Sequence, residues 1–272
     1  MKTILITGGT MGIGKGIAMS LLKQGNRVLV VSNSKKSGDL FIQETKKSGL
    51  VENAVFIQAN LSLISENNRL LEFVKNNFAR LDGLIFCATK HNKTYIETSE
   101  GLEFSFALDY LSRFILSYGW KEWLEKNNNP FILNICGTGL KGNVNWEDMQ
   151  HKNSFVPLKV MMHASRLNDL SGVQFAKNDT VGKIKYILYN PMAVNTPGMG
   201  DTGNLLFDLI FKLMAKPVEK AIIPILELLE NLPAGYLNSY TRRKQNSLKK
   251  ETFDEKKAER LYSITKRLLN GI

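Results

Sequence analysis

The sequence predicts an α/β protein with one doubly wound parallel sheet and helices on both faces of that sheet. Three observations support this fold class. Several short runs rich in β-branched residues are apolar throughout, which is typical of strands buried on both faces. Segments with helical spacing separate the runs, so strands and helices alternate. No repeat, low-complexity tract or linker interrupts the chain, and we expect a single domain over residues 1–272.

The predicted strands follow one another at intervals that leave room for a helix. They are the runs 3–7, 27–32, 54–59, 83–88, 131–136 and 184–190. Helical spacing of apolar residues begins near Gly14, Leu40, Glu66, Leu102 and Leu158. Right-handed crossovers between parallel strands then give the doubly wound arrangement.

The carboxy-terminal part departs from this alternation. After a breaker-rich stretch at 190–203, residues 204–214 have the spacing of an amphipathic helix, and we treat 204–232 as possible lid helices. Such a helix can close over a substrate pocket or pack on the body of the domain. Attachment to a membrane surface is a weaker alternative, because the polar face is not notably basic. The apolar side chains of this helix favour a hydrophobic ligand: Leu205, Leu206, Phe207, Ile210 and Phe211.

The composition is that of an ordinary globular protein, with 43% hydrophobic and 22% charged residues. No apolar window of about 18 residues and no signal peptide is visible, so we expect a cytoplasmic protein without a membrane span. Cys87 and Cys136 lie in apolar runs and are expected to be buried thiols, and no metal site is predicted. The net charge of +11 comes from scattered basic residues with an excess only at 241–251, which does not predict a nucleic-acid site.

A glycine-rich turn follows the first predicted strand and opens the first predicted helix. Glycines let the backbone turn sharply and approach a diphosphate, while the helix N-terminus presents free amides and the positive end of its dipole. This order of strand, turn and helix at the start of an alternating series predicts a Rossmann-type dinucleotide site. Its residues are Gly8, Thr10, Met11, Gly12, Ile13 and Gly14.

The end of the second predicted strand bears on the choice of dinucleotide. An acidic residue there would hold the ribose hydroxyls of NAD. The stretch 32–37 contains Asn33 and the two lysines Lys35 and Lys36, and no acid. The charge favours NADP over NAD, although lysines at a surface can equally be solvated.

The glycine pattern TGxxxGxG at residues 7–14 resembles that of the short-chain dehydrogenase/reductase superfamily. The resemblance covers almost the entire chain and is closest to the retinol-dehydrogenase-like branch. It is carried further by the segments 101–117, 131–149, 216–221 and 254–269. The family often forms dimers through its fourth and fifth major helices. Beyond the glycine turn, the resemblance implies cofactor contacts from Asn33, Asn60, Leu61, Ala88, Arg166, Pro191, Val194 and Thr196.

All four residues of the catalytic set that the resemblance implies are replaced in this chain. Family members use an Asn, a Ser, a Tyr as general acid/base, and a Lys that lowers the tyrosine pKa and holds the nicotinamide ribose. These positions carry Asp109, Gly137, Met162 and Arg166. A thioether has no exchangeable proton, so Met162 cannot protonate an alkoxide. The family glycines near the nicotinamide are replaced by Thr89 and Met192, and the adenine-side Asp is replaced by Asn60.

The neighbours of these positions offer partial substitutes. Thr138 or Cys136 can supply the missing serine side chain if either is turned into place. Arg166 keeps the positive charge and can bind ribose hydroxyls, and Asp109 can pair with it. His163 is the best substitute acid/base, but it lies about 100° around the helix from the Tyr position, which favours a structural role.

Three functions remain open from the sequence. In the first, the protein binds NADP(H) or a related nucleotide and has lost standard hydride transfer, and it serves as a binding, regulatory or partner subunit, with a homo-oligomer also possible. In the second, it is an NADP-dependent oxidoreductase for a hydrophobic carbonyl or alcohol and works through non-standard groups such as His163, Asp109 or an ordered water. In the third, it is a non-redox enzyme for elimination or hydration that uses Asp109 and Arg166.

Overall fold

The computed structural model describes residues 1–179, 181–196, 209 and 213–271. Most of the predicted helix at 204–214, including all the apolar residues named for it above, lies outside the described residues. None of the helices in the described ranges is both long and apolar enough to span a bilayer.

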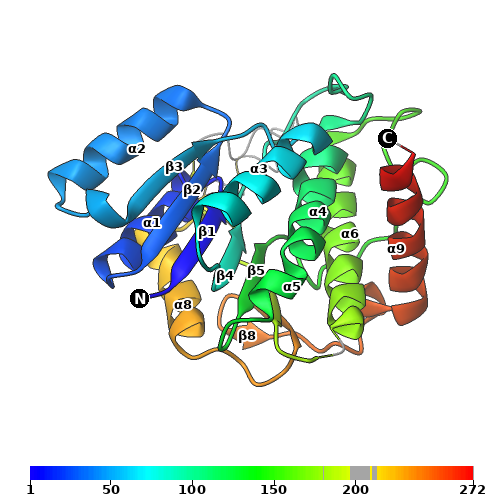
Figure 1. Cartoon of the computed structure of the whole chain (residues 1–272). Helices are drawn as coiled ribbons and strands as arrows, with labels where there is room; N and C mark the ends of the chain where they lie inside the picture. Colours follow the sequence, from blue (N-terminus) through cyan, green and yellow to red (C-terminus); the bar gives the residue numbers. More distant parts are fainter. Residues whose placement is uncertain (180, 197–208, 210–212, 272) are drawn as a thin grey trace.

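One eight-stranded sheet runs through the molecule in the order β3-β2-β1-β4-β5-β6-β7-β8 (Figure 1). Its strands are parallel except for the last, which is antiparallel to β7. Their bounds are β1 Thr3–Thr7, β2 Arg27–Ser32, β3 Ala54–Gln58, β4 Gly83–Phe86, β5 Phe131–Ile135, β6 Lys185–Asn190, β7 Leu237–Thr241 and β8 Lys244–Gln245. The first six strands are those predicted from the apolar runs, whereas β7 and β8 were not predicted.

Helices connect the parallel strands and cover both faces of the sheet, so the predicted doubly wound α/β fold is confirmed. Their bounds are α1 Gly12–Lys23, α2 Lys35–Lys47, α3 Ile64–Asn77, α4 Ser112–Gly119, α5 Lys121–Leu124, α6 Pro157–Asn178, α8 Val218–Glu230 and α9 Glu255–Asn270. Short helical turns are η1 Val51–Asn53 and η3 Glu251–Phe253, and a π-helix, η2 Phe106–Leu111, precedes α4. The second helix begins earlier than expected because Ser34 caps it and accepts a hydrogen bond from the Ser37 amide at 3.2 Å.

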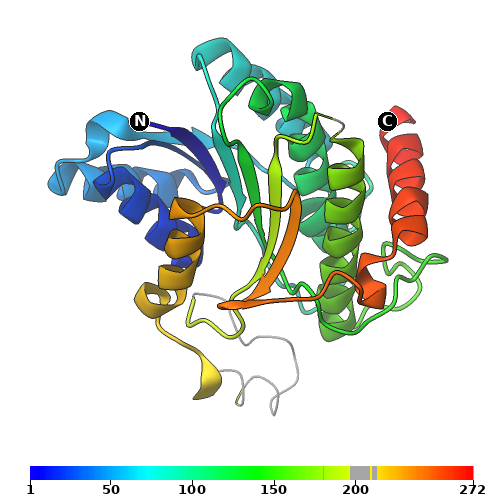
Figure 2. The same ribbon diagram turned by 90° about the horizontal axis from the view of Figure 1, so that it is seen from below.

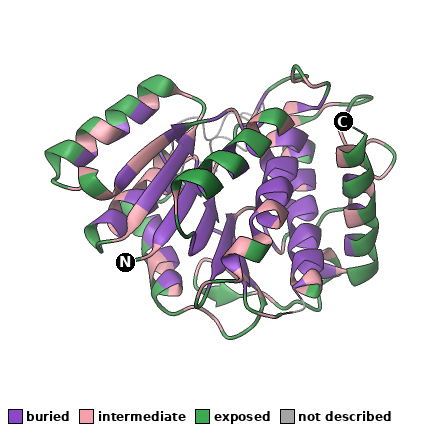
Figure 3. Cartoon of the chain, viewed as in Figure 1, coloured by how far each residue is buried: buried purple, intermediate pink, exposed green. Residues whose placement is uncertain are grey.

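Two apolar cores lie on opposite faces of the sheet. On one face, side chains of α1, α2 and α8 pack against the strands, including Ile17, Phe41 and Ile225. On the other face, α3, α4 and α6 pack against the strands, and α9 joins the same core through Leu261. Figure 3 shows α4 and α6 as almost entirely buried helices. This burial of α6 follows from α9, which runs alongside it (Figure 2).

The helix α8 falls within the segment 204–232 that the sequence assigned to possible lid helices. Its buried residues Ile222 and Ile225 belong to the core beside α1. Gly16 of α1 lies against it, because a Cβ at Gly16 would be 2.9 Å from Val218. Residues 218–230 therefore pack on the body of the domain in this structure, and the possible lid role of 204–232 stays a prediction.

Candidate functional site

The glycine turn lies between β1 and α1, at the point where the strand order reverses between β1 and β4. Gly8 and Gly12 have φ values of +67° and +53°, which strain residues with a side chain. A Cβ at Gly8 would also lie 2.7 Å from the Cα and N of Ala88, at the end of β4. Both the turn and its close approach to the next strand therefore require glycine.

The N-terminus of α1 presents an anion-binding surface. Its N-cap, Met11, is extended, half-exposed and makes no side-chain cap, and the first turn contains no acidic residue. Gly14 lets the helix pack against the turn, because a Cβ there would be 2.4 Å from the Gly8 carbonyl oxygen. The amides of Gly12, Ile13 and Gly14 precede the first intrahelical bonds, so they fit a diphosphate.

The adenosine side of this surface lies at the ends of β2 and β3. Asn33 is exposed, and Lys35 pairs with Asp39 at 2.9 Å. Lys36 is exposed at the N-terminus of α2, and none of the described residues pairs with it. Asn60 accepts hydrogen bonds from the amide and hydroxyl of Ser62, so its side chain stabilises its own turn, and Leu61 beside it is buried.

The loop after β6 approaches the glycine turn from the other side. Val194 is buried and forms a bridge with Lys216, and the Asn195 amide donates to the Lys216 carbonyl at 2.8 Å. This places the Thr196 methyl group against Gly12, where an added Cβ would be 2.9 Å away. The residues Gly8, Gly12, Ala88, Val194 and Thr196 therefore come from three loops at one edge of the sheet.

Pro191 and Met192 begin the same loop. Met192 replaces the family glycine and still adopts the left-handed φ of +64°. Its amide donates to the Asn190 side chain at 2.9 Å, which holds this backbone form. The chain has kept the glycine conformation at the cost of about 1 kcal/mol of backbone strain.

Arg166, in the Lys position, is 2% exposed and is bound within the protein. One guanidinium nitrogen, Nη2, lies 2.9 Å from the Asp169 carboxylate and donates to the Gly137 carbonyl at 2.8 Å. The same Asp169 oxygen accepts from the Gly139 amide and the Thr252 hydroxyl. The Asp109–Arg166 pair considered from the sequence is therefore not formed, because Asp169 lies one turn along the same helix as Arg166.

Asp109, in the Asn position, lies in the π-helix η2 and is 6% exposed. Burial raises the pKa of its carboxyl group, and the charge of Arg113 partly opposes this shift. Its Oδ1 atom has no hydrogen-bond partner among the described residues. Its main-chain carbonyl accepts a hydrogen bond from Asn168 Nδ2 at 2.8 Å, so this carbonyl already has a partner within the protein.

Gly137, in the Ser position, faces a hydroxyl from another element. A Cβ at Gly137 would lie 2.6 Å from Ser165 Oγ of α6, so the two residues are complementary in size. Thr138, the alternative source of a hydroxyl, is fully buried, and its hydroxyl is hydrogen-bonded to Ser239 of β7 at 2.8 Å. Burial raises the pKa of the Cys136 thiol to about 12, so this thiol is protonated at neutral pH.

Met162, in the Tyr position, is partly buried near the start of α6, and the adjacent His163 is buried. His163 is directed to a histidine of the preceding loop, since its Nδ1 lies 3.1 Å from His151 Nε2 and the two rings are nearly perpendicular. Burial lowers the pKa of His163 to about 4, so the imidazole is neutral at pH 7. No described residue pairs with its other ring nitrogen, Nε2.

A buried polar network below these positions was missed by sequence reasoning. Arg113 of α4 is 5% exposed and donates to Asn134, to the Ile135 carbonyl and to the Ala88 carbonyl. Asn134 of β5 in turn donates to Asn168 of α6 at 2.8 Å. This Arg113 network joins the ends of β4 and β5 to α4 and α6. Its sequence signal is an arginine among apolar and aromatic residues at 110–116.

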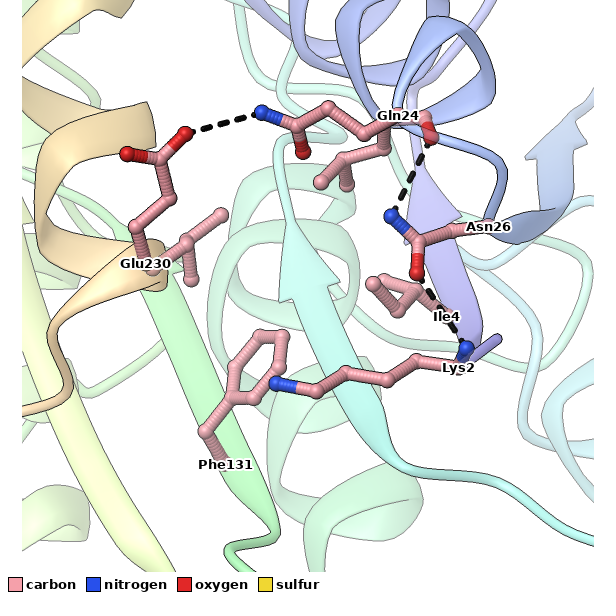
Figure 4. Close-up of a pocket in the computed structure, with 8 residues that line it drawn as sticks. Lys2, Ile4, Gln24, Asn26, Phe131 and Glu230 are labelled. Carbon is pink, nitrogen blue, oxygen red and sulfur yellow. Dashed lines mark hydrogen bonds between the residues drawn. The ribbon is translucent and has the colours of Figure 1, made fainter.

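A cavity of about 130 Å³ lies at the opposite edge of the sheet (Figure 4). Its rim carries Lys2, Asn26 and a hydrogen bond of 2.9 Å between Gln24 and Glu230, over an apolar floor that includes Phe131. Because it lies at the amino ends of β1 and β5, it is separate from the glycine turn and does not form part of the candidate site.

The family model of the short chain dehydrogenases matches residues 2–147, which include the glycine turn, Asp109 and Gly137. The chain belongs to the short-chain dehydrogenase family. Its similarity to the retinol-dehydrogenase-like branch is also confirmed: mouse retinol dehydrogenase 12 is 24% identical over 98% of this chain and 86% of the relative.

Solved members of the short-chain dehydrogenase family share the fold. A short-chain dehydrogenase from Sphingobium yanoikuyae, in complex with NADPH, is 16% identical, covers 100% of this chain and 96% of its own, and has a TM-score of 0.67. One from Burkholderia cenocepacia, in complex with NADP, is 15% identical and covers 88% of this chain and 95% of its own, with the same TM-score of 0.67.

Proposed function

We propose that this short-chain dehydrogenase relative binds NADP(H) and does not carry out the tyrosine- and lysine-dependent hydride transfer of its family. The proposal rests on a contrast at one edge of the sheet. The glycine turn has the backbone form that suits a diphosphate, with positive φ at Gly8 and Gly12. The Tyr position, by contrast, holds Met162, and the Lys position holds an arginine tied to Asp169.

Two observations support NADP as the cofactor. The N-terminus of α2 carries Lys36 without a partner among the described residues, and the stretch 32–37 has no acid that would repel a ribose phosphate. Related structures of the same fold hold NADPH or NADP. In this account the amides of Gly12, Ile13 and Gly14 hold the diphosphate, and Lys36 holds the ribose phosphate. Bound NADPH supplies a hydride in this family.

The loss of standard catalysis is supported by how the four replaced positions are used. Three of the polar side chains at or beside them are bound within the protein: Arg166 pairs with Asp169, Thr138 with Ser239, and His163 with His151. A positioned acid or base contributes roughly 10²- to 10⁴-fold to the rate of proton transfer. A protein without that contribution is suited to holding a dinucleotide rather than turning it over.

No specific observation in the described residues favours either of the two alternative functions. A non-redox enzyme based on Asp109 and Arg166 is not favoured, since Arg166 is paired with Asp169. An oxidoreductase based on His163 meets a neutral, buried imidazole held by His151. The predicted preference for a hydrophobic ligand stays a prediction, because the residues that suggest it lie outside the described ranges.

The cofactor proposal is tested by titrating the protein with NADPH and NADH and following intrinsic fluorescence. We expect saturable binding of NADPH and weaker binding of NADH. The variant Lys36→Ala should weaken NADPH binding about tenfold and leave NADH unchanged, since one charged hydrogen bond to phosphate is lost. Lys47→Ala, at the exposed opposite end of α2, is the matched control and should leave the binding of both NADPH and NADH unchanged. Absence of binding of both dinucleotides at millimolar concentration would rule the proposal out.

A further inference from the structure

A small cavity of about 10 Å³ lies beside Asp109, where three segments meet. The loop after β4 contributes His91 and Asn92, and the start of the next helix contributes Ser105 and Asp109. The start of α6 contributes Pro157, Val160 and Met161. A cavity of this size accommodates about one oxygen atom with its hydrogens. None of the four family catalytic positions other than Asp109 lines it.

Two of the residues that line the cavity each carry a buried polar atom without a partner among the described residues. These atoms are Oδ1 of Asp109, a hydrogen-bond acceptor, and Nδ2 of Asn92, a donor, in residues that are 6% and 8% exposed. Leaving a buried polar group unpaired costs about 1 to 3 kcal/mol. Folding therefore favours a guest that satisfies both atoms at once.

We propose that this cavity binds a single hydroxyl group, which donates to Asp109 Oδ1 and accepts from Asn92 Nδ2. A hydroxyl is the group of this size that can donate and accept through one oxygen. An anion would be repelled by the Asp109 carboxylate, and an ammonium ion would face the Asn92 N–H group. The hydroxyl comes from a water molecule or from an alcohol.

The surroundings of the cavity suit an alcohol whose carbon chain extends from the cavity towards the protein surface. Asn92, Ser105 and Asp109 are buried, whereas His91, Pro157 and Met161 are only partly buried. Pro157 and Met161 offer apolar contacts to the carbon atoms next to the hydroxyl, and Val160 closes the wall behind them. The guest is held by groups of this chain alone, so the inference does not depend on dinucleotide binding.

Crystals of the full-length protein, before and after soaking in ethanol, test the site directly. We expect an oxygen atom within hydrogen-bonding distance of both Asp109 Oδ1 and Asn92 Nδ2. It should be water in the unsoaked crystal and the ethanol hydroxyl, with its carbons near Met161 and Pro157, in the soaked crystal. An empty cavity would overturn the proposal. Water that ethanol does not displace would overturn its alcohol arm and leave a structural water site.

A solution titration measures the same binding without a lattice. Ethanol is added to protein with ¹³C-labelled methionine methyl groups, and the Met161 signal, identified with Met161→Leu, reports on the cavity. We expect a saturable shift for the wild type and about tenfold weaker binding for Asp109→Leu, because a charged hydrogen bond is lost. Asn92→Leu should also weaken binding. These losses are measured against Asn153→Leu, an exposed control that should bind as the wild type does.

If Asp109→Leu is too unstable to study, the conservative variant Asp109→Asn tests the site in its place. Its amide has nearly the same shape but no charge, so it should bind ethanol more weakly than the wild type. Equal affinity in the wild type, Asp109→Asn and Asn92→Leu would contradict the proposed site. NADPH titration of the same variants keeps this result separate from that of the cofactor proposal.

Discussion

Gly137 and Ser165 depend on each other at the replaced serine position. Because Ser165 Oγ would lie 2.6 Å from a Cβ at residue 137, the variant Gly137→Ser overpacks this site. We expect it to lower the free energy of unfolding by about 2 kcal/mol in urea denaturation. Ser165 donates to the Met161 carbonyl at 3.0 Å, so Ser165→Ala alone should cost less than Gly137→Ser.

The double variant Gly137→Ser with Ser165→Ala separates this contact from a general effect of losing glycine. Removing the Ser165 oxygen leaves room for the new side chain, so the double variant should be more stable than Gly137→Ser alone. Strictly additive losses would show that the two residues are not coupled. Any attempt to restore the family set through Met162→Tyr, Arg166→Lys and Gly137→Ser therefore also requires Ser165→Ala.

His163 makes the stability of the protein dependent on pH. Its pKa in the folded state is about 4, against about 6.5 for an unperturbed histidine, because burial disfavours the charged imidazole. Well above pH 6.5 the imidazole is neutral in both states and the contribution of His163 is complete. As the pH falls towards 4 the unfolded state takes up the proton first, and the free energy of unfolding drops by about 1.4 kcal/mol per pH unit.

Urea denaturation between pH 7 and 4 measures this dependence. The variant His163→Gln should show a shallower decline than the wild type, because it removes the buried imidazole. His151, whose pKa burial also lowers, accounts for part of the remaining decline. Equal slopes for the wild type and His163→Gln would contradict the assignment.

At the scale of elements, the apolar strands could be predicted and the polar edge of the sheet could not. The strands β1 to β6 are apolar because helices cover both of their faces. The missed strand β7 buries Asn238 and Ser239, whose side chains are satisfied by the Gly235 carbonyl and by Thr138. A buried strand whose polar groups find partners elsewhere in the chain has the composition of a loop.

The candidate site also contains one part that could be predicted from the sequence and one part that could not. The glycine turn was predictable because positive φ at Gly8 and Gly12 and the close contact with Ala88 leave a local signature in the sequence. The ion-pair partner of Arg166 could not be predicted, because the sequence contains both Asp109 and Asp169 and only the packing of α6 selects between them. The Arg113 network was missed because its side chains come from three elements far apart in the sequence, α4, β5 and α6.

The last helix, α9, covers the outer side of α6 and reaches α4. Tyr110 is hydrogen-bonded to Thr265 at 2.5 Å, and the rings of Phe114 and Tyr118 contact that of Tyr262. Related proteins often form dimers through the helices that correspond to α4 and α6. Because α9 covers this surface, we expect no dimer there, and chemical cross-linking of the protein in solution should join no two chains through α4 and α6. A dimer whose cross-links map to α4 and α6 would contradict this expectation.

At the scale of the whole molecule, the carboxyl edge of the sheet carries two different kinds of surface. Around β1 it retains the glycine turn and the exposed N-termini of α1 and α2, which suit a dinucleotide. Around β5 and α6 it is closed by internal bonds, with Arg166 on Asp169, Thr138 on Ser239 and Asn168 on the Asp109 carbonyl. The sheet and its helices have the form of a short-chain dehydrogenase, and we propose that this second surface no longer supports the standard hydride transfer of the family.

A single-turnover experiment tests this account most directly. The protein, saturated with NADPH as established by titration, is mixed with a panel of aldehydes and ketones, and absorbance of the reduced nicotinamide is followed. We predict that this absorbance decays no faster than the absorbance of NADPH in the absence of protein. Decay faster than this background that requires one of the carbonyl compounds would show that hydride transfer persists and would contradict the account.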